Sequence, residues 1–527
     1  MKIPGISALS PNDPSSFSNP EEAVIRHAHI DWRVNFERQV ISGSVTLTVE
    51  KVQDSAEKLS IHCRTILPCQ DTPAVVTDAN LTVLMSAISA GKPVAEAGGM
   101  HRFKFEQAVS IHSYLLAIVV AAITSLPVSE RCSVWAEESE VKASAWEFAQ
   151  AEEMLKIAED ICGPYEWGRY DLLVLPPSFG YGGMENPCIT FVTPTCVAGD
   201  RSLADVIAHE ISHSWTGNLV GIKNFEHFWL NEGWTMFVQR KIEARLFGVP
   251  HRHFSAILGI NELTDCIKSA KFPEYETTLV KDLNGIDPED VFNTVPYEKG
   301  HTLLFYLETL LGGPEAFDPF VKYYVKQFRG KTITTEQFKT CLYTFFADKK
   351  NVLDSVDWQT WFFGTGMPPV IPQYDTSLAE QCSKLAERWQ SFSETDLSSM
   401  EKAPLLADLS SPQKREFLHQ LLLSDVTLSV VKLAKMRELY NMDNIRNSEV
   451  KFRWLRLCIK SKWEDRIPDA LDFAVSQGRM KFVRPLFRDL YQWESSRERA
   501  LATFKANRGR MMYITARQVA MDLGLAE

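Results

Sequence analysis

The chain has 527 residues, of which 45% are hydrophobic and 23% are charged, an ordinary composition for a globular protein of about two to four domains. Its 56 lysine and arginine residues are outnumbered by 67 acidic residues, so the formal net charge is −11. This balance argues against nucleic acid as a partner, because such proteins need a basic face. The longest apolar run, residues 115–123, is far shorter than the roughly 20 residues that span a bilayer. We therefore expect no membrane span.

The N-terminal segment and the cysteines indicate the compartment. Residues 1–20 contain several prolines and serines and no long apolar stretch, so we interpret them as a disordered lead without a secretory signal. The ten cysteines are scattered and form no CxxC pair, which favours free thiols over a disulfide framework. The sequence therefore predicts a cytoplasmic protein.

Strand-like patterns dominate residues 21–137, which we assign to an N-terminal β-sheet domain. In the segment SGSVTLTVEKV, the apolar Val45, Leu47 and Val49 alternate with polar residues. This period of two is typical of a strand with one buried face. We expect a half-buried strand here.

Helical periods dominate from residue 138 onward. Residues 138–363 also contain one β-rich stretch, which predicts a mixed α/β domain, and residues 364–377 are rich in proline and glycine, which indicates a linker. Residues 378–527 contain only three glycines and several amphipathic stretches, which predicts an all-helical domain. One of its helices is predicted to be capped by Ser448 and to turn Val450 and Trp454 inward.

The segment His209-Glu210-Ile211-Ser212-His213 carries the clearest chemical signal. On a helix, residues four apart lie on one face, so both imidazoles can reach one metal ion while Glu210 projects toward a metal-bound water. Such a pentapeptide also arises by chance. Two ordinary helical histidines therefore remain an alternative at this point.

A third ligand strengthens the metal hypothesis, because catalytic zinc uses three protein ligands and one open position. Eighteen residues after His213, the sequence NEGW opens a second helix that is predicted to end at Gly248. Glu232 near its start can face back toward the first helix. By itself, an acidic residue at a helix start is explained equally well by the helix dipole. Together with the pentapeptide, Glu232 favours a zinc site.

These motifs resemble those of a known family. HEISH, the later NEGW and the preceding GGMEN are similar to the gluzincin aminopeptidases of the M1 family, and several longer stretches resemble its leukotriene A4 hydrolase subgroup: IHCRTILPCQDTP, YDLLVLPPSFGYGGMENPC, VPYEKG, FRWLRLCIKSKWED and QGRMKFVRPLF. The resemblance implies an α+β multidomain fold. Its parts would be an N-terminal β-sheet domain, a thermolysin-like catalytic domain and a C-terminal helical superhelix of armadillo/HEAT type. It also implies a monomer with one Zn²⁺ per chain.

The resemblance implies roles for individual residues of the catalytic domain. His209, His213 and Glu232 would hold the zinc ion, and Glu210 would act as the general base. Tyr297, in VPYEKG, would donate a hydrogen bond to the oxyanion of the tetrahedral intermediate. A phenol suits this role because it is a neutral donor at pH 7.

Two further segments would bind the substrate. Glu185 in GGMEN would bind the free α-amino group of a short peptide, and the loop would consist of Gly182, Gly183, Met184 and Glu185. Arg479 and Lys481 would hold the substrate's C-terminal carboxylate. Residues two apart diverge on a helix, so these two cations require an extended or turn segment if they are to act together.

The sequence also departs from the subgroup. Mammalian-type members carry a tyrosine where this chain has Phe292 and an aspartate where it has Glu289, and the aspartate directs the second hydroxyl during epoxide opening. The N-terminal domain is shorter than in relatives, and Leu59 and Ser60 stand where they carry a glutamine that lines the site. Loss of interior strands predicts exposed sheet edges and a smaller buried face.

Two functions follow from these observations. The first is a zinc aminopeptidase acting on short peptides, with epoxide hydrolase activity that converts leukotriene A4 to leukotriene B4. The alternative is a catalytically impaired splice or gene-model variant that acts as an interaction protein through its helical C-terminal domain. Every implied zinc ligand and the implied base are present, which favours the enzyme.

Overall fold

The computed structural model describes residues 19, 21–57, 73–268, 273–395 and 406–525. The predicted lead at residues 1–20 lies almost entirely outside the described residues. So do Leu59, Ser60 and nearly all of the IHCRTILPCQDTP motif. In the part of the chain that the structure describes, no helix is both long and apolar enough to cross a membrane.

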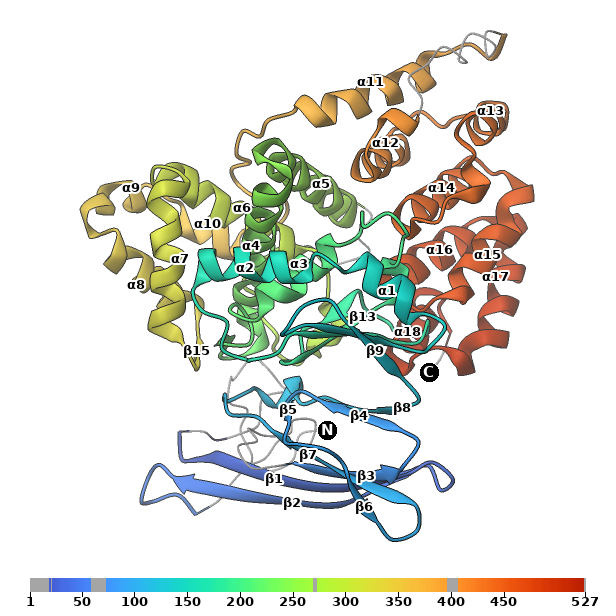
Figure 1. Cartoon of the computed structure of the whole chain (residues 1–527). Coiled ribbons are helices and arrows are strands. Elements are labelled where there is room, and N and C mark those ends of the chain that lie inside the picture. Colours follow the sequence, from blue (N-terminus) through green and yellow to red (C-terminus); the bar gives the residue numbers. More distant parts are fainter. Residues whose placement is uncertain (1–18, 20, 58–72, 269–272, 396–405, 526–527) are drawn as a thin grey trace.

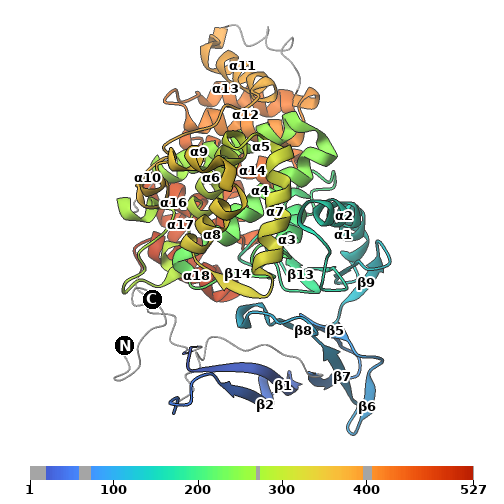
Figure 2. The same cartoon turned by 90° about the vertical axis from the view of Figure 1, so that its left-hand side faces the viewer.

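The N-terminal domain is a mixed sheet that lies below the rest of the molecule in both views (Figures 1 and 2). The strands pair in the order β2-β1-β3-β7-β5, with β6 also on β7: β1 (Ala23–Asn35), β2 (Val40–Lys51), β3 (Ala74–Asp78), β5 (Ile88–Ser89), β6 (Val94–Glu96) and β7 (Met100–Glu106). A separate antiparallel pair consists of β4 (Thr82–Met85) and β8 (Ile118–Ala121). The N-terminal β-sheet domain predicted from the sequence is therefore present.

Strand β2 is present as predicted, but the expectation that one of its faces is buried is wrong. Val45 and Val49 are each 40% exposed, whereas Ile30, the partner of Val45 on β1, is fully buried. The difference arises because β2 is the outermost strand of the sheet order. A long edge strand with apolar side chains is the liability expected of a shortened β domain.

The catalytic domain contains a second, five-stranded sheet. Its order is β12-β13-β11-β10-β9, formed by β9 (Thr124–Pro127), β10 (Ser133–Ala136), β11 (Asp171–Val174), β12 (Gly183–Met184) and β13 (Ile189–Val192). Strands β9 and β10 thus precede the domain boundary expected at residue 138, yet they pair within this sheet. By strand pairing, the chain passes from the N-terminal domain to the second sheet between Ala121 and Thr124.

Helices and one short strand pair complete the catalytic domain: α1 (Val141–Glu147), α2 (Ala151–Cys162), α3 (Asp205–His213), α4 (Trp229–Phe247), α5 (Val249–Lys268), α6 (Val295–Leu310), α7 (Pro314–Phe328), α8 (Thr335–Phe345), α9 (Lys350–Asp354), α10 (Trp358–Phe363), β14 (Val220–Ile222) and β15 (Lys331–Ile333). All of these elements except α5 share one large apolar core, in which Trp215, Trp229 and Trp234 are almost fully buried. Phe254 and Leu258 of α5 belong instead to the core of the C-terminal helices.

Two helices of this core approach each other closely beside the predicted zinc ligand. A Cβ atom on Gly233 of α4 would lie 2.8 Å from the Cα atom of Gly300 of α6, so only two glycines permit this spacing. Gly233 directly follows Glu232, and Gly300 is three residues after Tyr297. The glycine contact therefore brings these two side chains into the same region.

The described part of the C-terminal domain is all-helical, and its helices pack against one another beside the catalytic domain (Figure 1). They are α11 (Ser377–Ser391), α12 (Ser411–Leu423), α13 (Val430–Tyr440), α14 (Ser448–Lys460), α15 (Ile467–Ser476), α16 (Met480–Gln492), α17 (Glu494–Asn507) and α18 (Tyr513–Asp522). Residues 364–376 connect α10 to α11 without regular structure.

The cap of α14 differs from the prediction by one residue. Asn447 is the cap, and its side chain accepts hydrogen bonds from the main-chain N–H groups of Glu449 and Val450. An asparagine caps as well as a serine, so residue type alone did not distinguish Asn447 from Ser448. Val450 and Trp454 are buried as predicted.

Candidate active site

Helices α3 and α4 bring three potential ligand atoms together. His209 Nε2 and His213 Nε2 lie 3.2 Å apart, and each lies 3.4 Å from Glu232 Oε2. Ligand atoms about 2.0–2.1 Å from a tetrahedral zinc ion are separated by about 3.3 Å, so this triangle has the size of one face of such a site. Glu232 Oε2 is buried and makes no hydrogen bond among the described residues. The donor set therefore fits one zinc ion.

The other nitrogen of each imidazole is fixed by a partner that the sequence did not reveal. His213 Nδ1 lies 2.9 Å from the main-chain oxygen of Thr216, and His209 Nδ1 lies 3.0 Å from Gln239 Oε1. A proton on Nδ1 leaves the lone pair of Nε2 free for a metal. Gln239 follows Glu232 by seven residues, two turns along the same helix face, and this spacing was the available signal.

Glu210 is buried against the strand that carries the glycine pair. A Cβ atom on Gly183 would lie 2.3 Å from Glu210 Oε1, so a side chain at residue 183 would displace the carboxylate. Burial raises the pKa of Glu210 to about 7, with His209 and His213 opposing the shift. A carboxylate with a pKa near neutrality is suited to accept a proton and to release it again.

The GGMEN loop brings a second carboxylate to the histidines. Glu185 Oε1 lies 4.0 Å from His213 Nδ1, and the Glu185 main-chain oxygen accepts a hydrogen bond of 2.7 Å from Asn218 Nδ2. Glu185 and Glu210 lie close enough to His213 for their nearest ligand atoms to be within 4.8 Å of one another. Gly183 and Met184 form β12, which pairs with β13 and so fixes the start of this loop.

Tyr297 lies in the first turn of α6 and faces the histidines. Its ring stacks on that of His209 with 6.0 Å between the ring centres, and it meets the ring of Phe292 edge-on at 5.9 Å. Burial raises the pKa of Tyr297 well above its ordinary value, and the carboxylates of Glu232 and Glu185 raise it further. Tyr297 is therefore a neutral hydrogen-bond donor beside the three ligand atoms.

Arg479 and Lys481 converge on one carboxylate of the C-terminal domain. Arg479 precedes α16 in an extended conformation, and Lys481 occupies the first turn, so the two side chains do not diverge. Lys481 Nζ lies 3.0 Å and Arg479 Nη1 lies 3.5 Å from Glu449 Oε1. Glu449 is buried and is a site residue that the sequence did not indicate.

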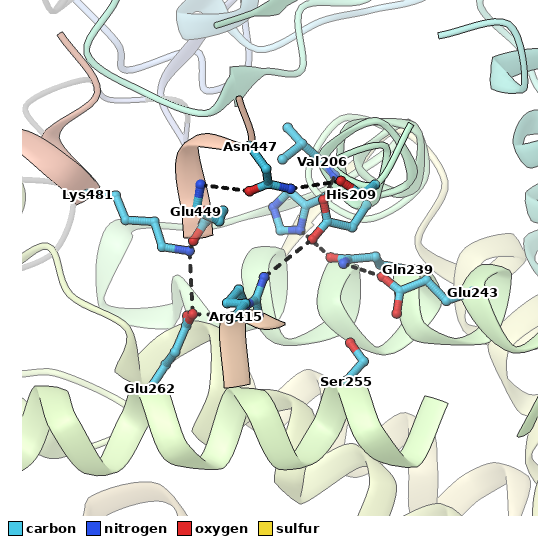
Figure 3. A network of polar contacts seen from close by, with 12 residues as sticks. Val206, His209, Gln239, Glu243, Ser255, Glu262, Arg415, Asn447, Glu449 and Lys481 are labelled. Atoms are coloured by element: carbon cyan, nitrogen blue, oxygen red, sulfur yellow. Dashed lines mark hydrogen bonds and ion pairs between the residues drawn. The ribbon is translucent and has the colours of Figure 1, made fainter. Parts of the chain in front are cut away.

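A wider ion network surrounds this pair (Figure 3). Glu449 also pairs with Arg453 at 2.6 Å, and Glu262 of α5 lies 2.8 Å from Arg453 and 3.6 Å from Arg415. Lys481 reaches Glu262 at 3.5 Å. These ion pairs bridge the catalytic and C-terminal domains.

The segment that carries Arg479 is also hydrogen-bonded to the catalytic domain. Gly478 donates a main-chain hydrogen bond of 2.7 Å to Pro177, and Met480 donates one of 2.8 Å to Gly180. A Cβ atom on Gly182 would lie 2.8 Å from Arg479 Nη2. Arg479 is thus held against the same loop that carries Glu185.

The two departures from the subgroup pattern also lie at this site. Phe292 ends the 3-10 turn Pro288–Val291 and is 40% exposed, with its ring against Tyr297. The pKa of Tyr181 is raised by burial first and by the negative charge of the Glu289 carboxylate second. Phe292 therefore lies beside Tyr297, and Glu289 lies near Tyr181 in the segment that precedes the glycine pair.

Comparison with known proteins agrees with this geometry. Residues 146–361 match the peptidase family M1 domain, and residues 409–523 match the leukotriene A4 hydrolase C-terminal domain. The chain is 43% identical to leukotriene A-4 hydrolase of Xenopus laevis, covering 98% of this chain and 99% of that protein. It is 42% identical to leucine aminopeptidase 2 of Aspergillus niger, and the alignment covers 85% of this chain and 73% of that protein.

The fold agrees over the whole chain as well. A yeast leukotriene A4 hydrolase structure in complex with bestatin superposes with a TM-score of 0.89 at 34% identity, covering 99% of both chains. The Xenopus alignment spans 608 positions against 527 residues here, so at least 81 positions hold no residue of this chain, which is internally shorter than that relative. The chain belongs to the leukotriene A4 hydrolase branch of the M1 family of zinc peptidases.

Proposed function

We propose that this enzyme is an aminopeptidase that removes N-terminal residues from short peptides, with one Zn²⁺ per chain. His209, His213 and Glu232 would hold the ion. The observation that carries this proposal is the triangle of their ligand atoms, with edges of 3.2, 3.4 and 3.4 Å. Two imidazole nitrogens that both present lone pairs at this distance repel each other unless a cation or a shared hydrogen lies between them, and Glu232 Oε2 completes the ligand set that a cation requires.

Glu210 and Tyr297 carry the chemistry contributed by the chain. When bound, zinc acidifies a water molecule and polarises the scissile carbonyl. Glu210 accepts the proton of the attacking water and passes it to the leaving amine, as its raised pKa allows. Tyr297 donates its phenolic hydrogen to the oxyanion, since its own pKa keeps it protonated.

Substrate orientation supports exopeptidase rather than endopeptidase action. Glu185 would bind the free α-amino group, because a carboxylate forms charge-assisted hydrogen bonds with an ammonium. Because Glu185 Oε1 lies 4.0 Å from His213 Nδ1, an amino group bound there would leave the first peptide bond near the ligand triangle. Arg479 and Lys481 would bind the C-terminal carboxylate of a short peptide and so fix both of its ends.

Epoxide opening of leukotriene A4 is the second activity that we propose, supported by the likeness to the Xenopus leukotriene A-4 hydrolase. The same Arg479 and Lys481 would bind the fatty-acid carboxylate. With Phe292 and Glu289 at the site, we expect a mixture of dihydroxy acids instead of leukotriene B4 alone. Chromatography of the products after incubation with leukotriene A4 tests this, and formation of only leukotriene B4 would contradict the expected loss of product control.

We further propose that the enzyme acts in the cytoplasm as a monomer. The eight cysteines among the described residues carry thiols and form no disulfide, the state that a reducing compartment favours.

Hydrolysis of an aminoacyl chromogenic substrate by the Glu210→Gln variant tests the aminopeptidase. We expect about one zinc per chain in both proteins and a rate loss of about 10³-fold or more in the variant. The control is Glu153→Gln on the exposed face of α2, which should keep full activity. Wild-type protein that binds zinc but cleaves nothing would favour the impaired variant instead, and cleavage of an N-acetylated peptide would contradict exopeptidase action.

A further inference from the structure

Helix α4 supplies a partner for each metal-binding histidine in addition to Glu232. Thr235 Oγ1 lies 3.1 Å from His213 Nδ1, and Gln239 Oε1 lies 3.0 Å from His209 Nδ1. One face of this helix therefore contributes a ligand and two orienting side chains. The two histidines nevertheless differ in how strictly their partners fix the ring hydrogen on Nδ1.

For His213, the main-chain partner alone fixes the ring hydrogen on Nδ1. Its nearest partner is the main-chain oxygen of Thr216, which can accept a hydrogen bond but never donate one. Because Nδ1 must then carry the hydrogen, Nε2 is left with the lone pair that a metal requires.

His209 faces a side-chain amide, which can present either of two groups. With its oxygen toward His209, Gln239 accepts from Nδ1–H. With its NH₂ group toward His209, it would donate to Nδ1 and force the imidazole hydrogen onto Nε2. In the second arrangement His209 could not bind zinc through Nε2. Something must therefore select the orientation of the Gln239 amide.

Glu243 provides that selection. Gln239 Nε2 donates a hydrogen bond of 2.7 Å to Glu243 Oε1, and an ionised carboxylate can only accept. Figure 3 shows Gln239 lying between His209 and Glu243. Both side chains are buried, with exposures of 6% for Gln239 and 3% for Glu243, so water does not offer an alternative partner on equal terms.

Several charged and polar groups surround Glu243. Burial raises the pKa of Glu243, as does Asp205, while His251, Gln239 and Arg240 act in the opposite direction. His251 Nε2 lies 3.8 Å from Glu243 Oε2. Glu243 touches none of the three proposed ligands, so its effect on the metal must pass through Gln239.

We propose that Glu243 is a positioning residue of the metal centre, which holds the Gln239 amide so that His209 presents Nε2 to zinc. This inference rests on the proposed function in taking His209 as a ligand. Outer partners of metal-bound histidines typically change metal affinity by about 10- to 100-fold. Glu243 would exert such an effect from one step further away.

The test is the zinc dissociation constant of the full chain, measured by competition with a chelator after the metal has been removed. Glu243→Leu should weaken zinc binding by about tenfold or more, because the Gln239 amide is then free to turn its NH₂ group toward His209. Glu243→Gln keeps the size of the side chain but can both donate and accept, so it should weaken binding by at least about threefold. Equal affinities in wild type and both variants would overturn the proposal.

A double variant separates this role from a general loss of packing. In Gln239→Glu/Glu243→Leu, the partner of His209 is a carboxylate, which has no donor to present, so Glu243 is no longer needed. Zinc affinity should return to within about threefold of wild type. If the double variant is as weak as Glu243→Leu, Glu243 acts through packing and the proposal fails.

Two controls keep the outcome distinct from that of the proposed function. Thermal unfolding of the metal-free proteins shows whether Glu243→Leu folds, and Glu243→Gln provides the comparison if it does not. A wild-type chain that binds zinc but cleaves no peptide would overturn the proposed function while leaving these affinities informative. A wild-type chain that binds no zinc would overturn both.

Discussion

Gly183 and Glu210 are in direct steric contact: a Cβ atom on Gly183 would lie 2.3 Å from Glu210 Oε1. Gly183 belongs to β12 and Glu210 to α3, so the strand that begins the substrate loop also sets the position of the proposed base. Gly183 is therefore required by the space beside it, and it does not adopt a left-handed backbone conformation.

Gly183→Ala should lower kcat/KM for an aminoacyl substrate by about 100-fold with zinc content unchanged, because the methyl group displaces Glu210 by the order of an ångström. The matched control is Gly509→Ala, since a Cβ atom there meets no atom within 4 Å. Steady-state kinetics and metal analysis of the two variants check this. Full activity in Gly183→Ala would show that the position of Glu210 does not limit the reaction.

Arg479→Gln should discriminate between peptides by their C-terminal end. Loss of a charge-assisted hydrogen bond of about 1.5–3 kcal/mol predicts a drop in kcat/KM of about 10- to 100-fold for a peptide with a free carboxylate. The amidated peptide should change by less than about threefold. Arg484→Gln serves as control on the same helix, because Arg484 pairs with Asp522 instead of Glu449. Equal losses on both peptides would argue that Arg479 has a structural role only.

His419 should make the C-terminal domain less stable in mild acid. Burial first, and then the charge of Arg453, lower the pKa of His419 to about 3. Below the ordinary histidine pKa of about 6.5, the unfolded chain binds a proton that the native chain does not, so the free energy of unfolding falls as the pH drops. At pH 5 this loss amounts to about 2 kcal/mol.

His419→Gln removes the titrating group and retains a side-chain donor, so its stability should decline less between pH 7 and pH 5. The measurement is urea unfolding at both pH values. If the wild-type and His419→Gln stabilities fall in parallel, His419 is not responsible for the acid sensitivity.

Two partner positions in the N-terminal sheet should respond in opposite ways to a lysine. Val45→Lys places the charge on a side chain that is already 40% exposed, so stability should change by less than about 0.5 kcal/mol. Ile30→Lys buries an unpaired charge and should cost on the order of several kcal/mol. The unfolding temperatures of the two variants, compared with that of the unchanged protein, test both expectations. The same Val45→Lys should also reduce aggregation, because a charge on an edge strand opposes pairing between molecules.

The convergence of His209, His213 and Glu232, the proposed zinc ligands, could be predicted from the sequence because the histidine spacing is local and the residue types are specific. Residues four apart on a helix share a face whatever surrounds them, as His209 and His213 show. Gln239 and Glu243 could not be found in this way, since glutamine and glutamate are common on helices and their role depends on how α4 packs against α3. The predicted burial of Val45 was wrong for a similar reason. Alternation of apolar and polar residues predicts a strand, but burial of the strand depends on whether another layer covers its face.

The attachment of the Gly478–Met480 segment to Pro177 and Gly180 has an evolutionary consequence. The proposed metal ligands all lie within a single domain, whereas the residues proposed to bind the two ends of a substrate are divided between two. Recombination could therefore transplant helices α3 and α4 alone into another scaffold, but the proposed selection of substrate length would be inherited only if both partners of that main-chain pairing moved together. On the proposed function, the C-terminal superhelix is part of the specificity apparatus and not an interchangeable appendage.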